Sequence, residues 1–302
     1  MTGKQAAAFG SLGILWGTEW IASGELGRHV PLLLGTAARF GLAAALLFPF
    51  MLVRWHAHRH PEKFIRGLRA SLILSATLLA LPVLLLSWAA GRVSTATTTV
   101  FFSATPLVVV LFSFIVREDR PSRTGWQALL LGWGGVALAI WNGSLPSFQG
   151  TAAVLLAVAS SAASIVYAKR ELAGISPVVS AGILLGGAAF LLQLASLVEE
   201  RGQRPDWNLA AIVALLYLGV ASAAGLVLYF WLLKELAGYQ VATIMWIEPL
   251  LGMIQAAILF RQPLSLSMIA GLTIALGCLF AVMRLRANDD AVLTLAGTGS
   301  GN

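Results

Sequence analysis

The 302-residue chain contains one cysteine, and only 11% of its residues are Asp, Glu, Lys or Arg. A single cysteine, Cys278, excludes a disulfide within these residues and gives no indication of thiol redox chemistry. Soluble domains contain about 25% charged residues. The much lower charged fraction of this chain argues against a soluble fold. The sequence also lacks a glycine-rich nucleotide-binding loop, a serine nucleophile motif and a zinc-protease motif. We therefore expect no cofactor and no enzymatic activity.

Long apolar runs make up most of the chain, and 58% of its residues are hydrophobic. A helix rises about 1.5 Å per residue, so about twenty apolar residues cross the roughly 30 Å hydrocarbon core of a bilayer. The runs are too long for membrane-barrel strands and do not alternate. The sequence predicts an all-α membrane protein with ten transmembrane helices, at residues 6–24, 31–53, 70–90, 94–115, 124–141, 150–169, 177–198, 209–232, 239–260 and 266–284.

The basic residues are divided unevenly between the two sides of these predicted helices. Counted from the N-terminus, fourteen Lys and Arg residues fall on the first side and five on the other, with Arg39 inside a helix. The positive-inside rule then predicts a multi-pass protein of a bacterial-type inner (plasma) membrane, with the N- and C-termini in the cytoplasm. Topology thus explains the net charge of +7, and nucleic acid is not an expected partner.

Tryptophan, proline and glycine recur with equal spacing in the two halves of the chain. The matching spacings are Trp88 to Pro106 with Trp231 to Pro249, and Pro121 to Gly135 with Pro263 to Gly277. We expect a single transmembrane domain over 1–302, with one repeat at 6–141, a second at 150–284 and a disordered tail at 287–302. Five helices per repeat is an odd number, so the second repeat begins on the opposite side of the membrane. The prediction is two inverted five-helix repeats around a central cavity.

Four segments carry a family resemblance: LWGTEW (15–20), VPLLLGTAARFGLAAALL (30–47), TPLVVVLFSFIVRED (105–119) and IEPLLGMIQAAILF (247–260). They resemble the drug/metabolite transporter superfamily and, within it, the ten-helix EamA-type exporters. The second half departs from the pattern, because Ala162 and Ala163 stand where the first half has Trp16 and Gly17. The overall pattern is most similar to the YddG kind of amino-acid exporter.

The resemblance implies a secondary transporter that exports small amphipathic solutes by alternating access, with aromatic or neutral amino acids as the first substrate class. Its partners would be the lipid bilayer, a small-molecule substrate and, if transport is coupled, protons; a monomer is expected. Export of lipophilic cations or other metabolites is the alternative. More remote alternatives are an intramembrane enzyme, which needs converging polar groups, and a non-transporting sensor, which needs no accessible cavity.

Glu248 lies near the middle of the predicted helix at 239–260. A charge at a helix centre costs about 2.5–3.5 kcal/mol on an insertion scale, so intramembrane carboxyl groups usually have a function. Pro249 removes a backbone donor and loosens the helix, and the counterpart of Glu248, Thr105, also precedes a proline. We expect Glu248 to face the central cavity and to bind a substrate ammonium or a coupling proton. A protonated carboxyl that stabilises the proline kink is the alternative.

Glu19 and Arg39 are the other charged residues inside predicted helices. Counted along the helix rise, their depths differ by roughly 4–5 Å, so we expect the two side chains to meet in the outer half of the membrane. A charge in the membrane normally has a partner. A structural ion pair, a gate and a carboxylate-binding group are all consistent with this pairing.

Aromatic and hydroxyl side chains on the inner helices complete the candidate site. They predict a mostly apolar cavity, with packing between helices as the alternative for each residue. The expected substrate-binding or gating residues are Trp16, Thr18, Glu19, Trp20, Arg39, Thr98, Phe101, Thr105, Ser164, Tyr167, Tyr229, Trp246 and Glu248. We expect no metal site, because no carboxylate or cysteine completes a ligand set for the loop histidines His56, His58 and His60.

Overall fold

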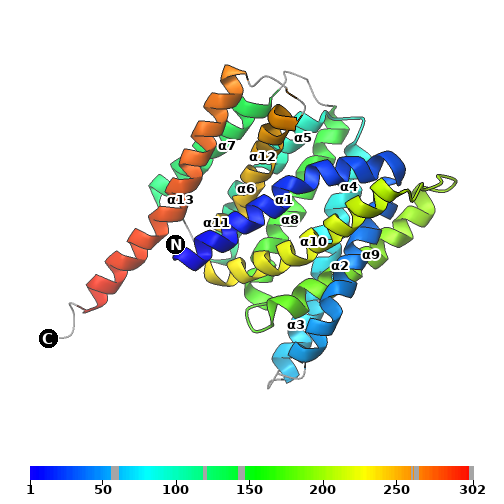
Figure 1. The fold of residues 1–302 in the computed structure, drawn as a ribbon. Coiled ribbons are helices and arrows are strands. Elements are labelled where there is room, and N and C mark those ends of the chain that lie inside the picture. Colours follow the sequence, from blue (N-terminus) through cyan, green and yellow to red (C-terminus); the bar gives the residue numbers. More distant parts are fainter. Residues whose placement is uncertain (56–60, 118–120, 142–146, 260, 262–264, 299–302) are drawn as a thin grey trace.

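The computed structural model describes the backbone of residues 1–55, 61–117, 121–141, 147–259, 261 and 265–298. Within these ranges the regular elements are all helices, and they form one bundle (Figure 1). In chain order they are α1 (Gly3–His29), α2 (Leu32–Trp55), α3 (Pro61–Leu74), the π-helical η1 (Ser75–Ala80), α4 (Leu81–Ala89), α5 (Thr95–Phe102), α6 (Thr105–Val116), α7 (Arg123–Ile140), α8 (Phe148–Glu171), α9 (Pro177–Glu199), α10 (Leu209–Glu235), α11 (Gly238–Ala242), α12 (Ile244–Leu259) and α13 (Leu266–Thr298).

Seven helical stretches of the described chain are long and apolar enough to cross a membrane. They are Leu32–Arg54, Phe64–Ala89, Thr95–Val116, Phe148–Glu171, Pro177–Glu199, Leu209–Glu235 and Leu266–Arg284. The three other predicted spans fall on α1, α7 and the broken pair α11 and α12. The predicted all-helical, multi-pass membrane fold is confirmed at this level.

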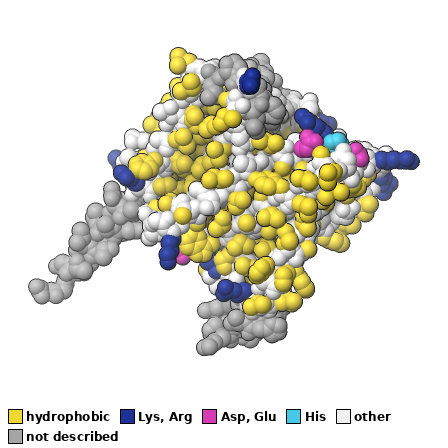
Figure 2. Space-filling model, in the orientation of Figure 1, with side chains coloured by type: hydrophobic (Ala, Val, Ile, Leu, Met, Phe, Trp, Pro, Cys, Tyr) yellow, Lys and Arg dark blue, Asp and Glu magenta, His cyan; other side chains and the backbone are white. Residues whose placement is uncertain are grey.

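The surface of the bundle is apolar over a broad band. Figure 2 shows hydrophobic side chains across the middle of one face, with Lys and Arg at its margins. Exposed large side chains include Val53, Ile115 and Leu209, each with about three-quarters of its surface accessible. Water-soluble monomers rarely expose contiguous apolar surface on this scale, so the band is the part of the protein in contact with lipid.

Three of the predicted helices are interrupted rather than continuous. The run at 70–90 contains the π-helical turn η1, which directly precedes α4 and its Pro82. A proline ring collides with the carbonyl four residues earlier, here that of Leu78, and the wider π turn relieves the collision. The other two breaks lie between α5 and α6, just before Pro106, and at Thr243 between α11 and α12. All three breaks lie in the helices that reach the interior of the bundle.

Helix packing is symmetric between the two halves of the chain. Helices in the same position of each half pack together, as α2 does with α9 and α7 with α13 (Figure 1). The contact between α1 and α10 corresponds to the contact between α8 and α4 in the exchanged halves. In the same way, the contact between α1 and α12 corresponds to the contact between α8 and α6. An exchange of the halves therefore preserves the packing, as a two-fold relation between them requires.

Small residues allow α7 and α13 to approach each other closely. A Cβ atom added at Gly135 would lie 2.8 Å from the backbone nitrogen of Ala275 and 2.9 Å from the carbonyl oxygen of Gly271. These helices thus touch backbone to backbone, as membrane helices do through small residues.

The final helix is longer than predicted. The backbone of α13 stays helical to Thr298, whereas the sequence predicted disorder from residue 287. Residues 287–296 contain no glycine or proline and include several alanines and leucines, which favour a helix. Figure 1 shows this end of α13 extending away from the bundle.

Candidate functional site

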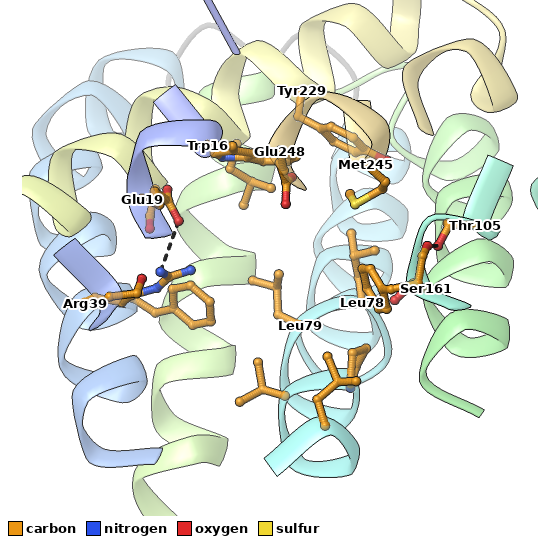
Figure 3. A pocket seen from close by; sticks show the side chains of 18 of the residues that line it. Trp16, Glu19, Arg39, Leu78, Leu79, Thr105, Ser161, Tyr229, Met245 and Glu248 are labelled. Atoms are coloured by element: carbon orange, nitrogen blue, oxygen red, sulfur yellow. Dashed lines mark hydrogen bonds and ion pairs between the residues drawn. The ribbon is translucent and has the colours of Figure 1, made fainter. Parts of the chain in front are cut away.

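A cavity of about 340 Å³ lies inside the bundle, and helices of both halves form its wall (Figure 3). Its volume is at the lower end of the range for small-molecule sites. Most of its surface is apolar. The lining residues are Trp16, Glu19, Trp20, Ser23, Arg39, Phe40, Leu78, Leu79, Pro82, Val83, Leu86, Phe102, Thr105, Ser161, Ile165, Leu185, Ser222, Leu226, Tyr229, Met245 and Glu248.

An ion pair joins α1 to α2 at the cavity wall. Arg39 Nη1 donates to Glu19 Oε2 over 3.1 Å, and the two side chains keep 21% and 13% of their surface accessible. The predicted meeting of Glu19 and Arg39 is confirmed. The contact uses one nitrogen and one oxygen, so most of the hydrogen-bonding capacity of both groups remains.

Glu248 lies on α12 and faces the cavity beside Met245 and Tyr229 (Figure 3). The prediction that this carboxyl faces the cavity is confirmed. Among the described residues it has no hydrogen bond or ion pair, although its charge interacts electrostatically with those of Glu19 and Arg39. Pro249 has no N–H to donate to the carbonyl of Met245, which leaves this backbone acceptor without its usual helical partner.

Trp16 and Tyr229 form an aromatic wall next to Glu248. Their rings stack with centroids 5.4 Å apart and planes inclined by 28°. Gly225, one turn before Tyr229 on α10, makes room for the indole, because a Cβ there would collide with Trp16 Nε1. The position of Trp16 therefore depends on a glycine in the other half of the chain.

Buried polar atoms without partners are concentrated around this cavity. Among the described residues, six buried side-chain polar atoms make no hydrogen bond. Four of them belong to cavity-lining residues: Glu19 Oε1, Arg39 Nε, Ser222 Oγ and the Tyr229 hydroxyl. Unpaired buried polar atoms are rare in proteins and cost free energy, so each calls for a ligand, water or ion. The cavity is thus built to hold a polar group despite its mainly apolar wall.

Comparison with known proteins identifies the family. The model of the EamA-like transporter family matches the chain twice, at residues 6–141 and 148–284. This chain belongs to the EamA-like transporter family. The two matched stretches lie within two residues of the halves inferred from the spacing of tryptophan, proline and glycine.

Several relatives of this EamA-like chain span most of its length. An uncharacterized transporter encoded in the trpA 3' region of Buchnera aphidicola subsp. Schlechtendalia chinensis is 26% identical over 248 residues, or 80% of each chain. The uncharacterized transporter YvbV of Bacillus subtilis (strain 168) is 25% identical over 272 residues, covering 89% of this chain and 88% of the relative. A crystal structure of a protein 20% identical in sequence shows the same fold, with a TM-score of 0.76 over 94% of this chain and 99% of the other.

Seven of the residues expected at the site of this EamA-like protein line the cavity: Trp16, Glu19, Trp20, Arg39, Thr105, Tyr229 and Glu248. They come from α1, α2, α6, α10 and α12. The Thr105 hydroxyl is already engaged, since it donates to the carbonyl of Phe102 over 2.5 Å. The charged residues and Tyr229 therefore carry most of the free polar capacity of the seven.

Three of the expected residues are held in packing contacts away from the cavity. Trp246 is fully buried, and its indole N–H donates to the carbonyl of Ser103 over 2.8 Å. Ser164 donates to the Thr77 hydroxyl over 2.7 Å, which links α8 to η1. Phe101 packs against the small cluster around Val154. Each of these three side chains takes part in packing between helices, which was the alternative considered for it.

The other three expected residues also lie outside the cavity wall. The Thr18 hydroxyl bonds to the carbonyl of Ile14 over 2.7 Å and meets the Tyr217 hydroxyl on α10. Tyr167 lines a separate cavity of about 250 Å³. Thr98 is half-buried on α5. The loop histidines considered for a metal lie outside the described residues, and within the described chain no cluster of three or more metal-ligating side chains occurs.

Sequence reasoning missed several apolar and hydroxyl residues of the wall. Leu78 and Leu79 reach the cavity from the π turn of η1, for which Pro82 was the available signal. Ser222 lies seven residues before Tyr229 on the same face of α10, a spacing that two helical turns predict. The other missed positions have no charge or break in the sequence to distinguish them from lipid-facing residues.

Proposed function

We propose that the protein is a secondary transporter that exports small amphipathic solutes by alternating access, with aromatic or neutral amino acids as its first substrate class. The observation that carries the proposal is the cavity of about 340 Å³ lined by both halves of the chain, apolar over most of its wall but containing Glu19, Arg39 and Glu248. A solute with charged groups and a non-polar body complements such a wall. Membership of the family supports the transport activity, and the composition of the cavity wall supports this substrate class.

The proposed architecture is ten transmembrane helices in two inverted five-helix repeats. Each of the ten predicted runs falls on one helix or on consecutive helices, and packing between the halves is preserved when they are exchanged. An odd number of spans per repeat inverts the second half, and two inverted halves can open one site to either side of the membrane in turn. The charge bias supports cytoplasmic termini in an inner membrane, and we expect the transporter to act as a monomer.

Lipophilic cations are the second candidate substrates. Glu248 stands beside the stacked rings of Trp16 and Tyr229. An aromatic face and a carboxylate together bind quaternary ammonium groups in other proteins. This candidate differs from amino acids in making no use of Arg39, so the two classes can be separated experimentally.

A transport assay tests the proposal. Purified protein in proteoliposomes would be offered a panel of labelled amino acids and one labelled quaternary ammonium, with protein-free liposomes as the control. We expect uptake of aromatic and neutral amino acids above the control, and competition among them. Transport of the quaternary ammonium alone would replace amino acids with the second candidate, and no transport of either would reject both.

A further inference from the structure

We propose that the cavity recognises an α-amino acid at two separate points, with the substrate carboxylate bound by Arg39 and the substrate ammonium bound by Glu248. This inference rests on the proposed function and deepens it, because it names the groups that choose the substrate. Figure 3 shows the two charged centres on different parts of the wall, Arg39 on α2 beside Glu19 and Glu248 on α12 beside Tyr229.

Arg39 has donors left for a second carboxylate. A guanidinium group carries five N–H donors, and the single contact with Glu19 uses one of them. Its Nε is buried without a partner, while the side chain itself lines the cavity. The neighbouring Phe40 ring lies 4.9 Å from the guanidinium carbon and holds the group in place. Glu19 therefore keeps Arg39 in position without exhausting its capacity to bind an anion.

Glu248 provides the complementary cation site. In the described chain it has no cationic partner in contact, and the charge of Arg39 is already compensated by Glu19. Tyr229 is 2% accessible and lines the same wall with an unpartnered hydroxyl. Trp16 stacks on Tyr229 and adds an aromatic face, which attracts an ammonium group. One carboxylate, one free hydroxyl and two rings are the surroundings that an ammonium group needs.

The charge balance of the wall leads to the same assignment. Its ionisable residues are Glu19, Arg39 and Glu248, and when all three are ionised one negative charge is left without a counter-ion. A ligand with an ammonium group supplies that counter-ion, and a ligand with a carboxylate but no ammonium adds to the excess negative charge. The substrate carboxylate must share Arg39 with Glu19. Removal of the Glu19 charge is therefore expected to tighten the binding of ligands that carry a carboxylate.

The apolar part of the wall accommodates the substrate side chain. Leu79, Val83, Leu86 and Phe102 line the cavity from η1, α4 and α5 and offer no charge to a polar side chain. Burial of a side chain the size of phenylalanine against such a wall removes apolar surface from water and so favours binding. Neutral, non-polar side chains are thus preferred over charged ones.

Three ligands with one common side chain test the assignment. They are L-phenylalanine, phenethylamine, which lacks the carboxylate, and 3-phenylpropionate, which lacks the ammonium. Calorimetric binding to purified wild type, Arg39→Gln, Glu248→Gln and Glu19→Gln gives a matrix of affinities. The control is Glu25→Gln, which removes a charge from α1 at a position outside the cavity wall.

In wild type, phenylalanine should bind more tightly than either of the other two ligands. Arg39→Gln should weaken the binding of phenylalanine by about tenfold to a hundredfold, as expected for the loss of a charged hydrogen bond, and it should not weaken the binding of phenethylamine. Glu248→Gln should weaken the binding of both phenylalanine and phenethylamine, and it should not weaken the binding of 3-phenylpropionate. Glu19→Gln should strengthen the binding of both ligands that carry a carboxylate, and Glu25→Gln should leave all three affinities unchanged.

Several outcomes overturn the assignment. If phenethylamine binds wild type as tightly as phenylalanine does, the substrate carboxylate is not recognised. If Arg39→Gln and Glu248→Gln each weaken the binding of all three ligands equally, the two residues do not bind different groups of the substrate. If Arg39→Gln does not fold, Arg39→Lys and the wild-type ligand series decide the question. If phenylalanine is transported but the affinities do not follow the expected pattern, the two-point assignment is rejected and the proposed function stands. No binding of any of the three ligands rejects the amino-acid proposal with it.

Discussion

Trp246 and Trp16 both belong to the residues expected at the site, but their surroundings differ. Trp246 is completely buried and donates its indole N–H to the carbonyl of Ser103. Trp16 lines the cavity and stacks on Tyr229. The first side chain contributes to stability through packing and a buried hydrogen bond, and the second is available to a ligand.

Trp246→Phe should lower stability without changing the substrate affinity of the folded protein. The substitution removes the donor to the Ser103 carbonyl and leaves a buried acceptor unpaired, a loss of about 1–3 kcal/mol. The measurement is the thermal unfolding midpoint in detergent, together with ligand binding by the folded fraction. Trp16→Phe is the matched comparison. Weaker binding by Trp246→Phe at an unchanged midpoint would show that this indole acts at the site after all.

The sequence predicted the charged part of the site better than its aromatic part. Glu19, Arg39 and Glu248 could be identified because a charge in a membrane helix needs a partner or a polar cavity. Trp246 could not be assigned in the same way, because an indole is equally compatible with helix packing. Its position depends on close packing against Gly132 and on the Ser103 carbonyl, neither of which follows from helix periodicity.

At the scale of helices, the contact between α7 and α13 depends on one glycine and not on its neighbour. A Cβ at Gly135 would press on the backbone of Ala275 and Gly271, whereas a Cβ at Gly134 would meet nothing within 4 Å. Gly135→Ala should destabilise the protein by about 1–3 kcal/mol, the usual cost of overpacking. Gly134→Ala should be neutral or slightly stabilising. Equal unfolding midpoints for the two variants would contradict the close approach.

Glu200 connects the end of α9 to the beginning of α2. Its carboxylate accepts hydrogen bonds from the backbone amides of Leu33 and Leu34 over 2.7 and 2.9 Å, and from the Ser196 hydroxyl over 2.7 Å. A carboxylate at a helix N-terminus satisfies free N–H groups and interacts favourably with the helix dipole. Sequence reasoning missed this contact, because nothing local to either segment specifies it.

Glu200→Gln should cost about 1 kcal/mol of stability, the typical value of a helix cap. The adjacent Glu199→Gln is the control, since Glu199 is exposed and makes none of these contacts. Chemical unfolding of both variants in the same detergent measures the difference. A loss of equal size in Glu199→Gln would assign the effect to net charge, and no loss in Glu200→Gln would show that the cap is dispensable.

The helices themselves were easier to predict than the breaks within them. Twenty apolar residues specify a span through their length alone, as in α9, which begins at the predicted Pro177. The break before Pro106 and the π turn before Pro82 had a proline as their signal. The break at Thr243 was not anticipated, because it lies six residues before Pro249 and α12 continues through that proline.

For the molecule as a whole, the proposed topology predicts which loops face the cytoplasm. Cys278 is the only cysteine, so a Cys278→Ser background allows single cysteines to be placed at will. Ala173→Cys, between α8 and α9, should react with a membrane-impermeant maleimide only after permeabilisation. Gln203→Cys, between α9 and α10, should react in intact cells. The reverse pattern would invert the proposed orientation.

The central proposal for the whole molecule is that the cavity containing Glu248 is the substrate site of a transporter. The most direct measurement is counterflow of a labelled aromatic amino acid by purified wild type and Glu248→Gln in proteoliposomes, at matched thermal stability. Wild type should exchange the amino acid, and Glu248→Gln should lose about tenfold or more in rate at subsaturating substrate, as expected for the loss of a charged contact. Equal exchange rates in the two proteins would contradict the proposal and make Glu248 a structural residue.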